Sequence, residues 1–278
     1  MFVKNGTGVL KKVLMSPPAY LEAAPINEIA KKWSHTRLDR EKMKAEFQNV
    51  VEAYRNNGVE VVQLEAAENR PNSVFARDFG GCVREGYILG RFREPIRFAE
   101  RGAFQKKLGE LGVPMVGEVK EGLFEGGDFA WLDDHTLAIG VIARTNMQGI
   151  AEIRAAVEPL GYTVVPVPCD PSYLHMDLLF NLVAEDLALV FRPALPQSFL
   201  DLLVKKGIEP IDVPAERVFH LGCNLEAIGN RRVIALKSNH VVNEMLAKHK
   251  IDVTEVDVTE ICKAGGGPHC MSFPLKRV

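Results

Sequence analysis

Apolar residues recur at helical spacing in five segments of the chain, and a glycine follows four of these segments. This spacing predicts amphipathic helices, and glycine is typical of the position just after a helix ends. Asn146 and Asn239 stand where a capping side chain is expected at a helix start. The predicted helices cover residues 40–57, 98–111, 146–160, 197–206 and 239–249.

Short β-rich runs alternate with the predicted helices. One such run follows each helix, as VEVVQL follows the first and YTVVPV the third. Before each later helix, two β-rich runs flank a tight polar turn (REG, DDH, AED or GNR), which is typical of a hairpin. A unit of two hairpin strands, a helix and a further strand therefore recurs, which predicts an α/β fold.

One polar position marks the period of this unit. Its copies fall 50, 49, 47 and 46 residues apart, near the start of the first hairpin strand in each unit. A repeat of this length indicates a propeller or an array of similar units. The five copies are Asp78, Asp128, Asp177, Asn224 and Cys270.

Closure of the repeat would place these five side chains around one axis. The last unit is complete if HCMSFPL (269–275) pairs with GVLKKVLM (8–15), and such closure leaves few open strand edges. Each Asp or Asn, taken singly, is more often a residue that starts a turn. Their shared repeat phase favours a common central cavity instead.

Composition and charge exclude several classes of protein. Apolar residues make up 47% of the chain and the net charge is -2, so neither nucleic acid nor an anionic membrane is expected as a partner. No apolar run reaches the roughly 18 residues that a membrane-spanning helix needs. The apolar run at the N-terminus contains lysines, which suit a first strand better than a signal peptide. Five widely spaced cysteines without a CxxC pair argue against a disulfide framework or a zinc ribbon and favour the cytoplasm.

Cys270 is the strongest candidate for chemistry because it follows a triple glycine, in AGGGPHCMSFP. A free cysteine is most often a buried structural residue, but glycine, proline and histidine are poor core material. The glycine run opens no helix and lacks the Lys-Ser/Thr ending of a phosphate loop. A thiol beside such a backbone favours a nucleophile.

Two further segments carry a histidine or paired acids. His175 and Asp177 stand two residues apart in LHMDLLFNLV, so a strand would put both side chains on one face. A lone histidine is more often structural, but this one could move protons at neutral pH, and the segment is weak as a metal site. Glu125 and Asp128 flank Gly-Gly in LFEGGDFAWL, where acids that start a turn are the ordinary explanation. The arginine before Asp78 could form a surface ion pair with it.

These residue types together point to a cationic substrate. Several carboxylates in one cavity select a cation, and a planar guanidinium can match two carboxylates through paired hydrogen bonds. Its carbon is electron-poor and can accept a thiolate. The bound cation would also lower the pKa of the thiol.

Four segments, in the same order, resemble the guanidino-group-modifying superfamily of arginine deiminases, dimethylarginine dimethylaminohydrolases, agmatine deiminases and amidinotransferases. They are ARD (76–78), FEGGD (124–128), HMD (175–177) and GGGPHCMS (265–272). The resemblance implies a five-bladed pseudosymmetric α/β propeller of ββαβ units, here a single catalytic domain over residues 1–278. It implies neither a metal nor a cofactor.

The resemblance also implies a role for each matching residue. Cys270 would be the nucleophile, His175 the general acid and base, and Glu125 the acid that supports His175 and contacts the guanidinium. Asp78 and Asp177 would hold the guanidinium nitrogens. The segment 15–33 resembles a loop that covers the substrate. Further substrate contacts are expected from Asp128, from Asn27 and, at an α-carboxylate, from Arg97 and Arg144.

The implied reaction is a hydrolysis through a thiouronium on Cys270, which would convert arginine or an Nω-methylated arginine to citrulline plus ammonia or amine. The acid at Asp177 favours an unsubstituted guanidinium end, because methyl groups remove N–H donors. Two related activities stay open. One is an amidinotransferase, and the other is an arginine dihydrolase that gives ornithine. In a dihydrolase an amide would be expected at the position of Asp78. A non-catalytic cation-binding propeller is the alternative of a different class. The partner is a small guanidino molecule, and a homodimer is allowed by analogy.

Overall fold

A computed structural model describes residues 2–278 and contains five three-stranded sheets of the same topology. In each sheet one outer strand pairs antiparallel with the middle strand, and the middle strand pairs in parallel with the third strand. The sheets are β15 (Phe273–Arg277), β1 (Leu10–Met15) and β2 (Glu60–Gln63); β3 (Gly80–Val83), β4 (Gly86–Leu89) and β5 (Met115–Glu118); β6 (Phe129–Trp131), β7 (Thr136–Val141) and β8 (Thr163–Pro168); β9 (Phe180–Ala184), β10 (Leu187–Val190) and β11 (Glu209–Asp212); and β12 (Glu226–Gly229), β13 (Arg232–Leu236) and β14 (Asp252–Val256).

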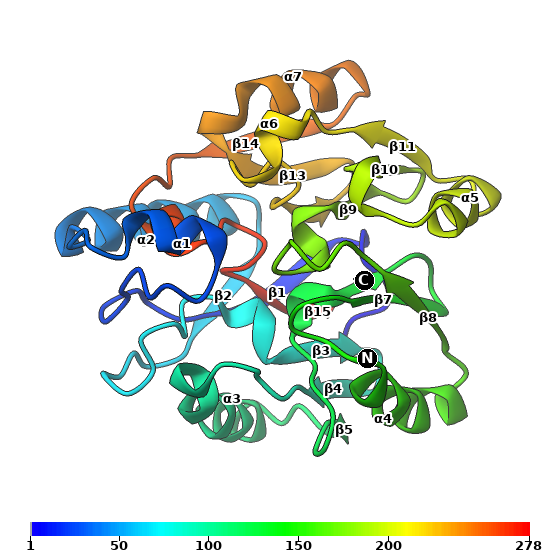
Figure 1. Ribbon diagram of the computed structural model, residues 1–278, viewed down its shortest axis with the longest axis horizontal. Helices are drawn as coiled ribbons and strands as arrows, with labels where there is room; N and C mark the ends of the chain where they lie inside the picture. The colour runs from blue at the N-terminus through cyan, green and yellow to red at the C-terminus, as the bar shows by residue number, and fades with distance from the viewer. Residues whose placement is uncertain (1) are drawn as a thin grey trace.

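A helix links the middle strand to the third strand in every unit, so the predicted order of two strands, helix and strand is confirmed. Figure 1 shows these helices at the rim of the molecule and the sheets nearer its middle. All five predicted helices are present, with ends that differ by at most a few residues. They are α2 (Arg40–Asn56), α3 (Phe98–Glu110), α4 (Met147–Val157), α5 (Gln197–Lys205) and α7 (His240–Lys248).

The last sheet joins the two ends of the chain. Strand β15 pairs antiparallel with β1, where Phe273 lies opposite Leu14 and Pro274 opposite Val13. The predicted pairing of the C-terminal segment with the N-terminal segment is therefore confirmed. This pairing brings the segment that carries Cys270 into the first unit of the chain.

Helix ends follow the sequence signals with one exception. Asn146 caps α4, because its Oδ1 accepts from the backbone N of Gly149 at 2.9 Å. The prediction for Asn239 is wrong: its Nδ2 donates to the carbonyl of His220, and it makes no capping bond to α7. The glycines that follow the first four helices all have left-handed φ, the region in which glycine is not strained.

The structure adds short elements that the periodicity did not predict. Helices α1 (Glu28–Trp33) and α6 (Ala215–Val218) lie outside the five predicted helices, and α1 falls in the segment that resembles a covering loop. The 3-10 turns η1 (Ala76–Phe79), η3 (Gly126–Asp128) and η5 (Met176–Leu178) each precede the first strand of a hairpin. The recurring acids therefore lie in these turns and not in the strands.

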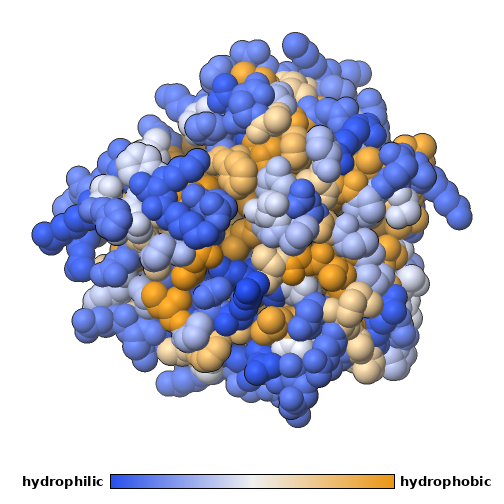
Figure 2. Space-filling view, viewed as in Figure 1, coloured by the Kyte–Doolittle hydropathy of each residue, from blue (hydrophilic) through white to orange (hydrophobic). Residues whose placement is uncertain are grey.

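Apolar side chains pack within and between the units. Three clusters of buried residues hold the aliphatic and aromatic side chains of the strands and of the inner helix faces. On the face seen in Figure 2, hydrophilic residues predominate over the region of α1 and α2, and hydrophobic residues show nearer the middle. None of the helices within residues 2–278 is long and apolar enough to cross a bilayer.

Candidate active site

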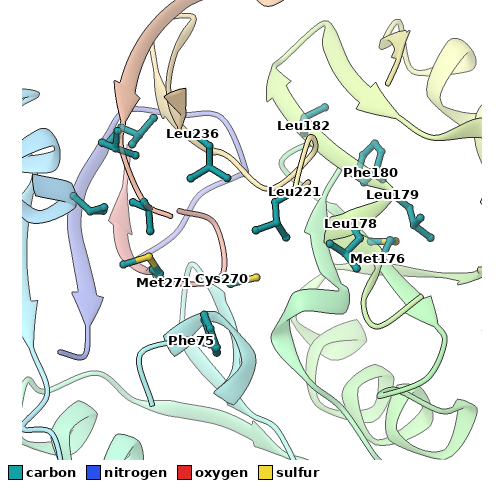
Figure 3. Packing of buried hydrophobic residues seen from close by; sticks show 14 of the residues in the cluster. Phe75, Met176, Leu178, Leu179, Phe180, Leu182, Leu221, Leu236, Cys270 and Met271 are labelled. Carbon is teal, nitrogen blue, oxygen red and sulfur yellow. The ribbon is translucent and has the colours of Figure 1, made fainter. Parts of the chain in front are cut away.

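The triple glycine lets the loop before Cys270 pack against two distant segments. Gly265 has a φ of +105°, and a Cβ added there would lie 2.4 Å from Oδ1 of Asn27. A Cβ added at Gly266 would lie 2.5 Å from the ring of Phe75. Figure 3 shows Cys270 above Phe75, with its sulfur on the side that faces the η5 turn. Only glycine fits these two positions without displacing a neighbour.

The thiol of Cys270 is buried, with 5% of the residue exposed, and contacts two polar side chains from other units. Nδ2 of Asn224 donates to Sγ at 2.9 Å, and Sγ donates to Oδ2 of Asp177 at 3.3 Å. Burial, followed by the negative charges of Asp177 and Asp78, raises the pKa of the thiol well above its ordinary value. We therefore expect the thiol of the ligand-free protein to be protonated at neutral pH.

His175 and Glu125 form a buried pair with 2.9 Å between Nε2 and Oε2. Burial opposes the charge on His175, but Asp78, Asp128 and Glu125 outweigh it and raise the pKa of the imidazole to about 10. Burial likewise opposes the charge on Glu125, but the hydrogen bond and charge of His175, with Arg144 nearby, lower its pKa to about 2. We therefore expect an imidazolium and a carboxylate at neutral pH.

Asp78 has one carboxylate oxygen bound and one free. Its Oδ2 accepts from Nη1 of Arg97 at 2.5 Å, and Arg97 also binds Glu100 at 2.8 Å. Within residues 2–278, Oδ1 has no hydrogen-bond partner, and it lies 3.7 Å from Nδ1 of His175. A buried acceptor without a partner is costly, so this oxygen is suited to a donor supplied by a ligand.

One small pocket, with about 320 Å³ of empty space, brings together the proposed catalytic residues from four different units. Its walls include Cys270, His175, Glu125 and Asp78, which sequence reasoning selected from segments far apart in the chain. Arg97, Arg144 and Asn27 line the same pocket. These seven side chains therefore share one site, as their predicted roles require.

Asp128 and Asp177 do not line this pocket. Asp128 is fully buried behind it, accepts from the backbone N of Met176 and from Thr145, and has a pKa raised to about 7 by burial. Asp177 lines a second cavity with about 650 Å³ of empty space, and its Oδ2 accepts from Nδ1 of His269 at 2.9 Å. Direct contact of either acid with a substrate stays a prediction.

Two residues of the predicted covering segment, Ile26 and Asn27, line the pocket. The carbonyl of Ile26 accepts from Nη2 of Arg144 at 2.5 Å. Asn27 accepts from Ala30 N, which caps α1, and donates to the carbonyl of Ala264. Part of this segment is helical, and the bonds to Arg144 and to Ala264 connect it to the pocket wall.

Two sequence-based interpretations of this region are wrong. Arg77 does not pair with Asp78 at the surface: it is buried and pairs with Glu226. His175 does not share a strand face with Asp177, because the chain enters the η5 turn directly after His175. Both side chains nevertheless lie near the thiol: Asp177 accepts from Sγ of Cys270, and His175 lines the same pocket as Cys270.

Two contributors were not given roles from the sequence. Asn224 shares the repeat phase of Cys270, which was a usable signal, and it contacts the sulfur. Thr145 bridges Asp128 and the backbone N of Glu125 through its hydroxyl. A threonine after an arginine in a loop carries no pattern that would have indicated this bridge.

Asp78, Glu125 and His175 present ligand atoms within 4.8 Å of one another, a spacing that could hold a metal ion. Each acid is already paired with a cation, Asp78 with Arg97 and Glu125 with Arg144. Two guanidinium charges beside the cluster oppose the binding of a further cation. The arrangement therefore favours an ion-pair network over a metal centre.

Comparison with known proteins agrees with this geometry. Residues 18–277 match the family described as N,N dimethylarginine dimethylhydrolase, eukaryotic. The chain belongs to this family. It is a guanidino-group-modifying enzyme, a hydrolase that acts on C–N bonds of amidines, as the sequence predicted.

The chain has relatives of similar length and relatives that are longer. YkgA of Bacillus subtilis (strain 168) is 32% identical over 271 residues, which are 97% of this chain and 93% of YkgA. The arginine deiminase of Limosilactobacillus reuteri (strain DSM 20016) is 28% identical over 253 residues, 74% of this chain but only 62% of the deiminase. The chain thus spans less than two thirds of that enzyme.

Solved structures share the fold of this family member. The N-terminal domain of ArgZ, a cyanobacterial arginine dihydrolase bound to product, has a TM-score of 0.84 at 23% identity, covering 96% of this chain and 97% of that one. DDAH from Pseudomonas aeruginosa, complexed with citrulline, has a TM-score of 0.79 at 23% identity, covering 96% and 100%. At such identities the likeness concerns the fold.

Proposed function

We propose that this protein hydrolyses a guanidinium C–N bond of arginine or of an Nω-methylated arginine and releases citrulline with ammonia or an amine. One observation carries the proposal: the Cys270 thiol, the His175–Glu125 pair and a carboxylate oxygen of Asp78 that has no partner within residues 2–278 share one buried pocket. A nucleophile, a proton carrier and a charged acceptor are the groups that attack on a guanidinium carbon requires.

A cationic substrate would make the thiol reactive. The negative charges of Asp177 and Asp78 favour the protonated thiol, as does burial. A guanidinium that binds Oδ1 of Asp78 would offset this charge and stabilise the thiolate of Cys270. The enzyme would thus hold an unreactive thiol until the substrate arrives.

The reaction would proceed in two halves. The Cys270 thiol first gives its proton to solvent as the substrate binds, and the thiolate Sγ bonds to the guanidinium carbon. His175 gives its proton to the departing nitrogen, and the C–N bond breaks to leave a thiouronium. The now neutral His175 takes a proton from water, whose oxygen adds to the same carbon. The C–S bond then breaks and the added hydroxyl gives its remaining proton to solvent, which regenerates the thiolate and leaves a neutral ureido group on the product.

We propose that the substrate tail contacts Arg144 and also Asn27, which belongs to the covering segment. Arg144 is the better placed of the two predicted arginines, because its Nη2 bonds to a backbone carbonyl that a substrate carboxylate could replace. Arg97 is held by two carboxylates, from Asp78 and Glu100, so most of its donors are occupied. We assign Arg97 chiefly to the orientation of Asp78.

We also propose that the five sheets close into a five-bladed propeller that forms one domain over residues 1–278. Neighbouring units contact each other through β15 and β3, β6 and β9, β9 and β12, and β12 and β1. The turns η1 and η3 are also in contact. This arrangement supports a ring of units around the pocket.

An assay for the ureido product tests the proposed reaction. Arginine, mono- and dimethylarginine, agmatine and guanidino acids are compared with wild-type protein, Cys270→Ser and Cys262→Ser, a half-buried cysteine outside the pocket. We expect citrulline from arginine or a methylarginine, loss with Cys270→Ser and retention with Cys262→Ser. Absence of a ureido product and of amidino transfer from every compound would refute the proposal.

The same assay separates the alternatives. Release of ornithine from arginine would indicate a dihydrolase, against which the acid at Asp78 argues. Transfer of the amidino group to added glycine would indicate an amidinotransferase. Tight binding of arginine without turnover, unchanged in Cys270→Ser, would indicate a cation-binding protein.

A further inference from the structure

His269, which the proposed reaction does not use, contacts the same carboxylate, that of Asp177, as the thiol does. Oδ2 of Asp177 accepts from Nδ1 of His269 at 2.9 Å and from the Cys270 thiol at 3.3 Å. A single carboxylate oxygen therefore contacts both side chains. A change of charge on one of them must alter the free energy of charging the other.

His269 is more exposed than Cys270 and faces a different cavity. Its side chain is 12% exposed and lines the second cavity, whereas Cys270 lines the small pocket. Within residues 2–278, Nε2 of His269 makes no hydrogen bond. This nitrogen is thus available to take up a proton from water that enters the second cavity.

The groups around His269 come from four units and nearly balance in charge. Its carbonyl accepts from Nε of Arg77, whose guanidinium pairs with Glu226. Arg277 also pairs with Glu226 and lines the same cavity. Arg77 and Arg277 thus both pair with the carboxylate of Glu226. The acid that contacts the imidazole of His269 is Asp177.

We infer that His269 is a positioning residue for the Cys270 thiol, acting through Asp177 by taking up positive charge as the thiol loses its proton. The thiol releases one proton into the small pocket, and Nε2 of His269 binds one from the second cavity. Nδ1 keeps its proton and its bond to Asp177, so the local net charge is conserved. A thiolate beside Asp177 without this imidazolium would place two anions in contact.

A titration of the thiolate tests this inference. The thiolate is followed by its ultraviolet absorbance, as the difference between each protein and its Cys270→Ser counterpart, and by the rate of alkylation of the Cys270 peptide. We expect His269→Asn, which keeps a donor near Nδ1 but cannot gain a proton, to reduce the thiolate fraction at a given pH by about tenfold, equivalent to one pKa unit. His269→Phe, which also removes the donor, is expected to reduce the thiolate fraction further. The control His135→Phe, at an exposed histidine, is expected to leave the thiolate fraction unchanged.

A double-mutant cycle separates this role from a general effect on folding. In the Asp177→Asn background, His269→Asn is expected to leave the thiolate fraction unchanged, because the connecting carboxylate is gone. A wild-type titration in His269→Asn, or an equal effect with and without Asp177, would overturn the inference. The inference rests on the proposed role of Cys270, but the titration needs no turnover, so it can fail while the ureido assay succeeds.

Discussion

Nε2 of His175 lies 2.9 Å from Oε2 of Glu125, although the two residues are separated by a complete unit of the repeat. Both side chains are almost fully buried, at 2% and 0% exposure. The combined negative charge of Asp78, Asp128 and Glu125 outweighs the cost of burying an imidazolium here. This dependence makes both stability and activity sensitive to pH.

Stability should decline in alkaline solution because of His175. Its pKa is raised from 6.5 to about 10, so its contribution is complete below pH 6.5 and is lost as the pH rises through about 10. The free energy of unfolding, measured with urea across this range, should fall by up to about 1.4 kcal/mol per pH unit. His175→Gln should flatten this dependence and the exposed variant His135→Gln should retain it. Equal slopes in all three proteins would contradict the assignment.

Asp128→Asn should be tolerated and should stabilise the protein at alkaline pH. The pKa of Asp128 is raised from 3.8 to about 7, so ionisation of this buried acid costs stability as the pH rises between these values. An asparagine can still accept from Met176 N and bond to Thr145. We expect a gain on the order of 1 kcal/mol above pH 7, shrinking on acidification, in urea unfolding.

The matched control is Asp201→Asn, an exposed acid on α5, which should not change the pH dependence. A less stable Asp128→Asn protein above pH 7 would show that the charge of this carboxyl is needed for folding.

Asp78→Asn should weaken substrate binding more than it slows turnover. The neutral side chain can still accept from Arg97, but it no longer offers a charged oxygen to a guanidinium. Loss of a charge-assisted hydrogen bond is worth about 1.5–3 kcal/mol, or roughly 10- to 150-fold in KM. Steady-state kinetics with the best substrate checks this, with exposed Asp201→Asn as the control. A fall in kcat at constant KM would assign Asp78 to the chemical step instead.

Glu46→Gln should loosen the loop that leads to Cys270. This buried carboxylate on α2 accepts from the backbone N–H groups of Glu260 and Ile261 and from both donors of Thr259. Hydrogen bonds to a charged group contribute about 1.5–3 kcal/mol, so we expect a loss of about 2 kcal/mol in urea unfolding together with a lower kcat. Glu52→Gln, exposed on the same helix, is the control. Full activity in a destabilised Glu46→Gln protein would show that the loop does not position the thiol.

The sequence by itself determined the local order of the chain and the list of candidate residues. The mean period of about 48 residues from Asp78 to Cys270 follows from strands and helices whose apolar spacing is a local property. Left-handed glycines such as Gly58 ended helices as predicted, because glycine alone adopts that conformation without strain. The resemblance of four short segments then selected Cys270 and His175 correctly as neighbours in space.

Only the tertiary structure decided which of these groups pair and which face a pocket. Asp78 binds Arg97 and not the adjacent Arg77, and Asp177 faces the second cavity beside His269. Partners in such pairs come from different units, and the choice depends on how buried charges are neutralised where units meet. No spacing along the chain encodes that choice, because the free energy of a buried ion pair depends on the three-dimensional surroundings of both groups.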